Sequence, residues 1–219
     1  MADSATDLGL PPVDVEQVRV AVLDRLGELR DAGELPEVAR LRLLWTSRPD
    51  GGGALDLTTS ELPEDAGAAH VRTTSWRRNR AGATRGHKGT DYVDNLAALA
   101  QAVAGGAGEA IFADTAGMLC EGSGTNVFYV VDDELRTPAL TTGCLPGITR
   151  GLVLEWFGGR EVEEPLDVLG RASEVFLTSS TREVQPVASC EGWTYDAPGP
   201  VTSDVRAMWG RRSRETPDP

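Results

Sequence analysis

Lys88 is the only lysine among the 219 residues of this chain, and the other members of its 21 Lys and Arg residues are all arginine. Arginine replaces lysine wherever a position needs only a cation, but its guanidinium stays protonated and cannot act as an amine nucleophile. A single remaining lysine therefore suggests amine chemistry. The alternative is that an arginine-biased composition left one lysine by chance, and the lysine alone does not decide between the two.

The first candidate partner of this amine is the loop Glu121–Asn126, with the sequence EGSGTN, which precedes an apolar segment. Its two glycines let the backbone turn tightly. A carboxylate at Glu121 can then point into a cleft, as functional side chains on loops often do. An ordinary charged turn is the alternative interpretation.

The second candidate is the segment Leu145–Arg150, with the sequence LPGITR, at the start of a predicted helix. Free backbone N–H groups and the positive end of the helix dipole make such a helix N-terminus a site for anions. Thr149 adds a hydroxyl group. The alternative is a Pro-Gly turn that merely starts a helix.

The third candidate is the hydroxyl run Thr178–Thr181, with the sequence TSST, between two predicted strands. Such a run can donate several hydrogen bonds to a phosphate, or it can bond its own backbone. A unique amine, a carboxylate and two phosphate-type loops together match the needs of pyridoxal phosphate. This cofactor uses a Schiff-base lysine, an acid at its ring nitrogen and an anion pocket.

The elements that carry these residues are predicted from the spacing of apolar residues. Helices are expected over residues 15–29, 92–103, 149–157, 166–171 and 203–211, the first capped by Asp14 and Gln17. Strands are expected over residues 41–45, 69–76, 110–114, 126–131, 134–137, 174–178 and 183–188. The strand at 69–76 is predicted to pair with the strand at 41–45. Because strands and helices do not alternate strictly, the pattern favours an α+β fold over a doubly wound sheet.

Three parts are expected along the chain: a small N-terminal domain over residues 1–76, a linker over 77–87 and a cofactor-binding domain over 88–219. The stretch 77–87 is basic, contains two glycines and lacks hydrophobic periodicity. In an acidic chain this composition favours a solvated linker over a nucleic-acid patch.

Composition excludes several classes of partner. The net charge of −13 and a pI near 4.6 argue against nucleic acid or an anionic membrane as a partner. Residues 1–12 lack the pattern of a signal peptide, and the run 96–107 is too short to span a bilayer. We therefore expect a cytoplasmic protein. Three widely spaced cysteines and two histidines indicate neither a disulfide framework nor a metal site.

Five segments of the chain resemble, in order and spacing, the motif series of the class IV aminotransferases, the pyridoxal-phosphate fold-type IV family. They are Lys88–Tyr92, Glu121–Phe128, Thr137–Pro138, Leu145–Arg150 and Phe176–Val187. Residues 8–12 and 40–43 also resemble the N-terminal domain of this family. The family includes branched-chain aminotransferases, D-amino-acid aminotransferases and 4-amino-4-deoxychorismate lyases.

The resemblance implies pyridoxal 5'-phosphate as the cofactor and Lys88 as the catalytic, Schiff-base lysine. The implied cofactor-binding residues are Lys88, Glu121, Ile148, Thr149, Ser180 and Tyr92. In this assignment Glu121 pairs with the pyridine nitrogen, and Tyr92 lies near the phenolic oxygen. The phosphate is bound by the backbone and hydroxyl of Ile148 and Thr149, and Ser180 occupies the position of a later phosphate hydroxyl.

The resemblance also implies an α+β fold of fold type IV, with a truncated small N-terminal α/β domain. The larger C-terminal domain is expected to hold a barrel-like β-sheet with flanking helices. Family members begin with strands and a Gly-Asp-Gly-like segment that brings an arginine to the cofactor phosphate, and this chain is expected to start after that point. A homodimer with active sites near the domain interface is implied as well.

Three functions remain as alternatives. The first is transamination between an amino acid and a 2-oxo acid. The second is the lyase reaction that produces 4-aminobenzoate and pyruvate in folate biosynthesis, because the short spacing from Lys88 to Tyr92 resembles the lyase and D-amino-acid branches. The third is an N-terminally truncated, non-catalytic remnant that keeps the scaffold as a binding or dimerisation module.

Overall fold

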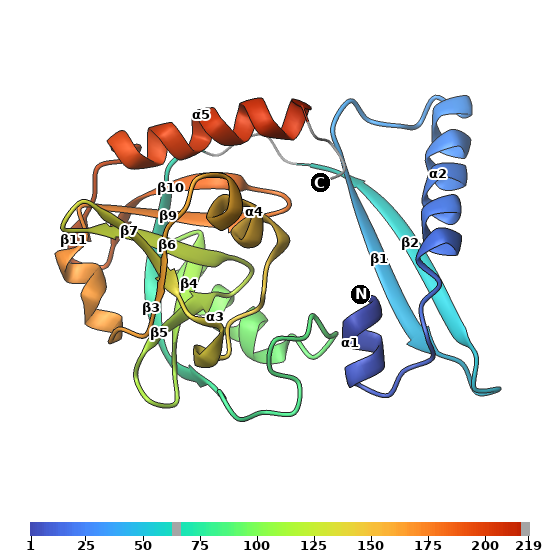
Figure 1. Ribbon diagram of the computed structural model, residues 1–219, viewed down its shortest axis with the longest axis horizontal. Coiled ribbons are helices and arrows are strands. Elements are labelled where there is room, and N and C mark those ends of the chain that lie inside the picture. The colour runs from blue at the N-terminus through green and yellow to red at the C-terminus, as the bar shows by residue number, and fades with distance from the viewer. Residues whose placement is uncertain (63–66, 216–219) are drawn as a thin grey trace. The chain divides into compact units, whose positions relative to one another are not determined.

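A computed structural model describes residues 1–62 and 67–215 of the chain. These residues form two compact units, Met1–Glu64 and Asp65–Pro219 (Figure 1). The division lies earlier than the domain boundary expected after residue 76. The strand at 69–78 accounts for this difference, because it pairs with strands of the larger unit.

The smaller unit contains two helices and a two-stranded antiparallel sheet. Its elements are α1 (Ala2–Asp7), α2 (Val15–Asp31), β1 (Ala39–Ser47) and β2 (Gly53–Glu61). The predicted cap of α2 is confirmed, since Asp14 Oδ1 accepts hydrogen bonds from the N–H groups of Glu16 and Gln17 at 3.0 and 3.1 Å. Helix α2 packs against β2 within this unit.

The expected pairing of the strand at 41–45 with the strand at 69–76 is wrong. β1 pairs instead with β2, in a continuous antiparallel register from Ala39 opposite Glu61 to Ser47 opposite Gly53. The glycine-rich turn after Arg48 brings these two strands together, and Arg48 N–H donates to the Gly52 carbonyl at 2.7 Å. A tight turn makes this local pairing easier to form than a pairing with a distant strand.

The larger unit contains nine strands, three α-helices and two short 3-10 helices among its described residues. The strands are β3 (Ala69–Arg78), β4 (Glu109–Asp114), β5 (Leu119–Gly122), β6 (Asn126–Val131), β7 (Glu134–Pro138), β8 (Arg160–Val162), β9 (Glu174–Ser179), β10 (Glu183–Cys190) and β11 (Trp193–Thr194). The helices are α3 (Val93–Ala104), η1 (Leu140–Thr142), α4 (Ile148–Trp156), η2 (Leu166–Arg171) and α5 (Pro200–Glu215).

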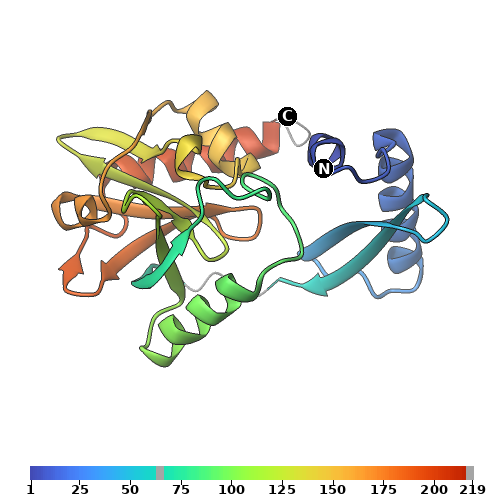
Figure 2. The ribbon, with the colours of Figure 1, turned by 90° about the horizontal axis from the view of Figure 1, so that it is seen from below.

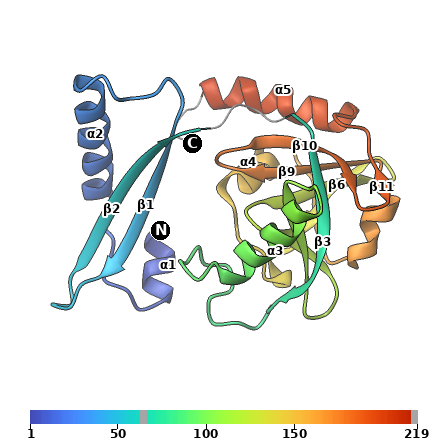
Figure 3. The ribbon, with the colours of Figure 1, turned by 180° about the vertical axis from the view of Figure 1, so that it is seen from behind.

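The nine strands form one mixed sheet in the order β5-β4-β3-β10-β9-β6-β7-β8, with β11 paired to β10. β3 is parallel to both β4 and β10, and β7 is parallel to β8. Helix α3 packs against β3 and β4, α4 packs against β9, and α5 packs against β9 and β10 (Figures 2 and 3). The predicted α+β fold with a curled sheet and flanking helices is confirmed.

Both faces of the central strands β6 and β9 are buried. Val127, Tyr129 and Leu177 face one apolar cluster, which includes Ile111. Phe128 and Phe176 face another, where their rings stack with centroids 4.9 Å apart beneath side chains of α4 and α5. This double burial explains why these strands read as continuous apolar runs in the sequence rather than as alternating ones.

Most predicted elements are present, including the helix that begins at Val93 and the strands on either side of the Asp132-Asp133 turn. Both turn residues have positive φ, as the tight turn between β6 and β7 requires. Within the described ranges, no helix combines the length and the apolar character needed to cross a membrane.

Candidate functional site

Lys88 lies in the loop between β3 and α3, and its side chain is exposed. Its Nζ donates a hydrogen bond to the Tyr92 hydroxyl at 3.0 Å and lies 5.1 Å from the centroid of the Tyr92 ring. Tyr92 is the residue immediately before α3. The structure therefore joins two of the predicted site residues and leaves the amine accessible.

Glu121 lies on β5 and is almost fully buried, with 9% of its surface exposed. Its Oε1 is 3.0 Å from Nε of Arg78, as an ion pair. Its Oε2 accepts a hydrogen bond from the N–H of Leu145 at 2.9 Å. The Glu121 carboxylate thus links β3 to the loop before α4.

The charge of Glu121 depends on competing effects. Burial raises the pKa of its carboxyl group, because the charged form loses its hydration. The positive charge of Arg78, the N–H of Leu145 and the positive charge of Lys88 act in the opposite direction and lower this pKa. Of the two cations, Arg78 has the larger effect on Glu121.

The peptide of Leu145 is held from both sides. Its N–H donates to Glu121, and its carbonyl accepts a hydrogen bond from Asn126 Nδ2 at 2.8 Å. Gly147 follows at a place where a Cβ atom would overlap Asn126 Oδ1. The turn that leads into α4 therefore needs glycine here, because the amide of Asn126 occupies the space of a side chain.

Helix α4 begins after Gly147 without a side-chain cap. The first N–H groups of such a helix lack intrahelical partners and remain available to an anion. Thr149 is buried, whereas Ile148 is 76% exposed. The loop of Lys88 lies against this turn, since the position of a Cβ on Gly86 is 3.8 Å from Pro146 Cδ.

The hydroxyl run spans the end of β9 and the turn after it, and its four members have different environments. Ser179 Oγ accepts a hydrogen bond from the backbone N–H of Arg182 at 3.1 Å, so part of the run stabilises its own turn. Ser180 is exposed. Thr178 is buried, and its Oγ1 has no hydrogen-bond partner among the described residues. No described contact joins Ser180 to Lys88, Glu121 or Thr149.

Glu109, at the start of β4, organises the loop that follows Glu121, although sequence analysis gave it no role. Only 1% of its surface is exposed. Its Oε1 accepts hydrogen bonds from the N–H of Ser123 at 2.9 Å and from the Ser123 hydroxyl. Its Oε2 lies 3.4 Å from both Thr125 Oγ1 and Arg182 Nη1. One buried carboxylate therefore ties the Glu121 loop to the residue that follows the hydroxyl run.

The expectation of a solvated linker over residues 77–87 is wrong for two of its arginines. Arg78 pairs with Glu121, and Arg80 Nη1 lies 3.3 Å from the fully buried Asp114. Arg80 also contacts Glu163 at 3.1 Å. The first two residues of the stretch end β3, and the rest forms a loop inside the larger unit that the ion pairs of Arg78 and Arg80 anchor.

Sequence signals for these missed residues exist but are weak. Arg78 and Arg80 are two positions apart, which places them on one side of an extended chain. Glu109 is a charged residue directly before a buried apolar strand, and Asn126 ends the glycine-rich motif. Each signal becomes specific only when the opposing carboxylate or backbone group is known.

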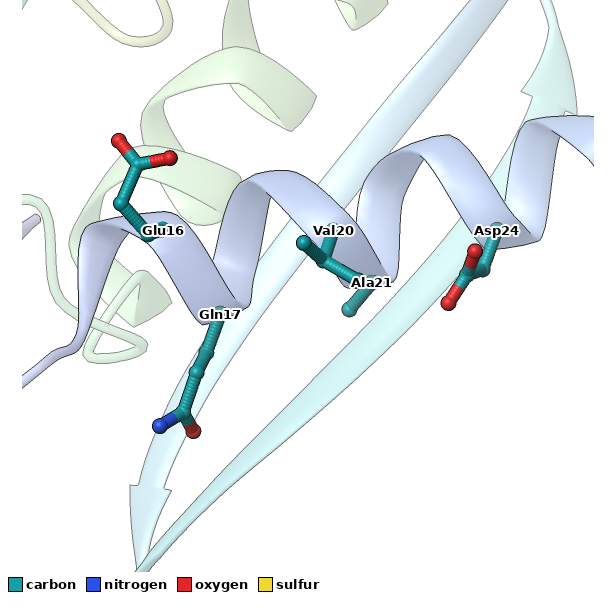
Figure 4. A pocket seen from close by; sticks show the side chains of 5 residues that line it. All are labelled: Glu16, Gln17, Val20, Ala21 and Asp24. Carbon is teal, nitrogen blue, oxygen red and sulfur yellow. The ribbon is translucent and has the colours of Figure 1, made fainter.

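A shallow surface pocket lies elsewhere, on α2 in the smaller unit (Figure 4). Its lining comes from one helix and consists of Glu16, Gln17, Val20, Ala21 and Asp24. None of the predicted site residues contributes to it. A depression formed by a single helix offers no convergent polar groups for catalysis.

Comparison with solved structures identifies the class to which this fold belongs. The chain matches a fold IV transaminase from Curtobacterium pusillum at 26% identity and a TM-score of 0.86, covering 98% of this chain and 78% of that chain. It also matches a provisionally assigned 4-amino-4-deoxychorismate lyase from Legionella pneumophila at 21% identity and a TM-score of 0.85, covering 95% of this chain and 81% of that chain. The fold is that of the fold-type IV transaminases.

The chain belongs to the class IV aminotransferase family, whose model (Amino-transferase class IV) matches residues 1–190. A branched-chain-amino-acid aminotransferase from Pseudomonas aeruginosa is 36% identical over 148 residues, which are 64% of this chain and 48% of that protein. The chain thus spans about half the length of the curated relatives it matches. The family membership predicted from the five motifs is confirmed.

The role of Glu109 can be tested by Glu109→Gln. The variant keeps the shape of the side chain but removes the negative charge that pairs with Arg182. Its amide N–H group can also face the donors of Ser123, so that two donors meet. We expect the free energy of unfolding to fall by about 1–3 kcal/mol, as for other buried groups that lose partners. Urea denaturation followed by circular dichroism measures this loss.

The matched control for this experiment is Glu155→Gln, on the exposed surface of α4. It should leave the free energy of unfolding unchanged. Equal stability of Glu109→Gln and Glu155→Gln would contradict the organising role of Glu109.

Proposed function

We propose that the protein is a pyridoxal-phosphate-dependent class IV aminotransferase, which transfers an amino group between an amino acid and a 2-oxo acid. The observation that carries this proposal is that the loop of the chain's only lysine lies against the same turn that the buried carboxylate of Glu121 holds, through Gly86 beside Pro146 and through the N–H of Leu145. The likeness to the branched-chain-amino-acid aminotransferase of Pseudomonas aeruginosa supports the same reaction.

The residues present fit this cofactor. Lys88 offers an exposed amine, and the buried Glu121 offers a carboxylate for the pyridine nitrogen. The uncapped start of α4, with the backbone of Ile148 and the hydroxyl of Thr149, suits the phosphate group. When bound, the cofactor supplies an electron-withdrawing ring that stabilises a carbanion at the α carbon of an amino acid.

The proposed roles of the chain's own residues follow from their contacts. Lys88 would hold the cofactor through Nζ, and its amine is placed to take and return the α proton of the substrate. Tyr92 orients this amine, because its hydroxyl accepts a hydrogen bond from Nζ at 3.0 Å. Ser180 would add a hydroxyl donor for the phosphate.

Glu121 would accept a hydrogen bond from the protonated ring nitrogen and thereby keep the ring in its electron-withdrawing form. Its second oxygen is already engaged by the N–H of Leu145. Through Leu145 and Asn126, the acid that would hold the ring nitrogen is coupled to the turn whose N–H groups would bind the phosphate. The two ends of the cofactor would thus be held by one connected set of hydrogen bonds.

A second candidate is the 4-amino-4-deoxychorismate lyase reaction, which produces 4-aminobenzoate and pyruvate for folate biosynthesis. The short spacing from Lys88 to Tyr92 favours it. The likeness to the Legionella pneumophila structure, at 21% identity, concerns the fold alone. A non-catalytic remnant is the third candidate, and it predicts that pyridoxal phosphate does not bind.

We further propose that the protein is a cytoplasmic homodimer that binds neither nucleic acid nor a membrane. The family resemblance supports the dimer, and the net charge of −13 supports the absence of polyanionic partners. Multi-angle light scattering of the purified protein distinguishes a dimer from a monomer.

Binding of pyridoxal phosphate provides the first test. Titration of the wild-type protein should produce a visible absorbance band, and Lys88→Ala should abolish it because no other lysine can replace the amine. Lys88→Arg is the matched control, since it retains the positive charge but cannot form the covalent link. After borohydride reduction, mass spectrometry should find the cofactor on Lys88, with the N-terminal amine as the only other amine available.

Lack of any band in the wild-type protein at saturating cofactor would favour the non-catalytic remnant. A band that persists in Lys88→Ala would contradict the role of Lys88.

Product analysis tests the reaction itself. With branched-chain amino acids and 2-oxoglutarate, we expect formation of the corresponding 2-oxo acids, measured by chromatography. With aminodeoxychorismate, formation of 4-aminobenzoate without transamination would instead establish the lyase. Lys88→Ala is the control in both assays and should be inactive.

A further inference from the structure

The surroundings of Glu121 contain one cation with no role in the mechanism described above. Arg78 lies at the end of β3, with its Nε 3.0 Å from Glu121 Oε1 and 19% of its side-chain surface exposed. Lys88, in contrast, is exposed and uses its amine elsewhere. Arg78 is therefore the fixed charge partner of Glu121.

Arg78 is held in place by groups other than Glu121. Its Nη1 donates a hydrogen bond to Asn95 Oδ1 at 2.8 Å, and its guanidinium carbon lies 4.1 Å from the centroid of the Phe112 ring. Asn95 is itself buried and donates from Nδ2 to the Ser123 carbonyl at 2.6 Å. The guanidinium is thus oriented by a helix, a strand and the Glu121 loop before any ligand binds.

Few other groups can balance the charge of Glu121. The titratable and charged groups that act on it are Arg78 from β3, Lys88 from the loop before α3, Cys120 on its own strand and Cys144 in the loop before α4. Burial raises the pKa of both thiols, so they stay neutral. Among the cations, Arg78 opposes the effect of burial most strongly.

We propose that Arg78 is a positioning residue of the site: it fixes the orientation of Glu121 and keeps this acid in its charged form, ready for the ring nitrogen of the cofactor. The proposal rests on the function proposed above. A neutral Glu121 would be a weaker partner for a protonated ring nitrogen, because the interaction between opposite charges would be lost. Arginine suits this role since its planar fork contacts Glu121 and Asn95 at once.

The first test is made on the protein without cofactor. The titration of Glu121 is followed by NMR of ¹³C-labelled glutamate carboxyl groups, with Glu121→Gln to assign the signal. In Arg78→Met the midpoint should rise by about one to three pH units, the range expected when a carboxylate loses an adjacent arginine. Arg72→Met is the matched control on the same strand, where the arginine is exposed, and should leave the midpoint unchanged.

A second variant distinguishes the loss of charge at residue 78 from a folding defect. Arg78→Gln keeps N–H donors but loses the charge, so it should show the same rise with better retention of structure, as checked by circular dichroism. Arg78→Lys restores the charge without the fork. The titration midpoint of Glu121 in this variant should lie between those of the wild-type protein and Arg78→Met.

The second readout is the absorbance spectrum of bound pyridoxal phosphate as a function of pH. In Arg78→Met the midpoint of the spectral change should differ from that of the wild-type protein, and in Arg72→Met it should not. A wild-type protein that binds the cofactor while Arg78→Met leaves both midpoints unchanged would overturn the proposal. A wild-type protein that binds no cofactor would overturn the proposed function, and with it the role of Arg78 at the ring.

Discussion

The buried carboxylate of Glu109 is the constraint on which the rest of the site depends. A charge with 1% exposure must find its hydrogen bonds within the protein, and Glu109 finds them in the turn after Glu121 and in Arg182. This turn places Glu121 on one side and Asn126 on the other, and both hold the peptide of Leu145. Because Leu145 lies in the turn that leads into α4, holding its peptide also positions the start of this helix. The loops that the sequence offers as separate candidates are therefore parts of one connected hydrogen-bond network.

The same network explains the contrast between one lysine and many arginines. Arg78, Arg80 and Arg182 each meet a buried carboxylate at the edges of this network. A guanidinium can pair with such a group, donate a hydrogen bond to a second one and remain charged. Lys88 has a different environment, because its amine is exposed and contacts the hydroxyl and ring of Tyr92. Three of the arginines thus support the structure through buried carboxylates, whereas the single lysine offers an exposed amine.

Membership of the class IV aminotransferase family agrees with this division. Five motifs were recognisable in the sequence, and the structure brings Lys88, Tyr92, Glu121 and the turn before α4 into one neighbourhood. Ser180 remains exposed after β9, while Ser179 stabilises its own turn. The hydroxyl run therefore contains both a structural residue and an accessible one, which its uniform sequence could not distinguish.

The sequence by itself determined the positions of most helices and strands, the capping of α2, the α+β class and the family. These features depend on residues close together in the chain, through periodicity, capping and turn geometry. Only the tertiary structure decided that β3 lies between β4 and β10 rather than beside β1, and that Arg78 and Arg80 turn inward. The partners in these interactions are distant in sequence, and one extended segment can pair with any strand of suitable length. Which carboxylate meets which arginine therefore follows from the order of the strands, and this order is set by packing over the whole sheet.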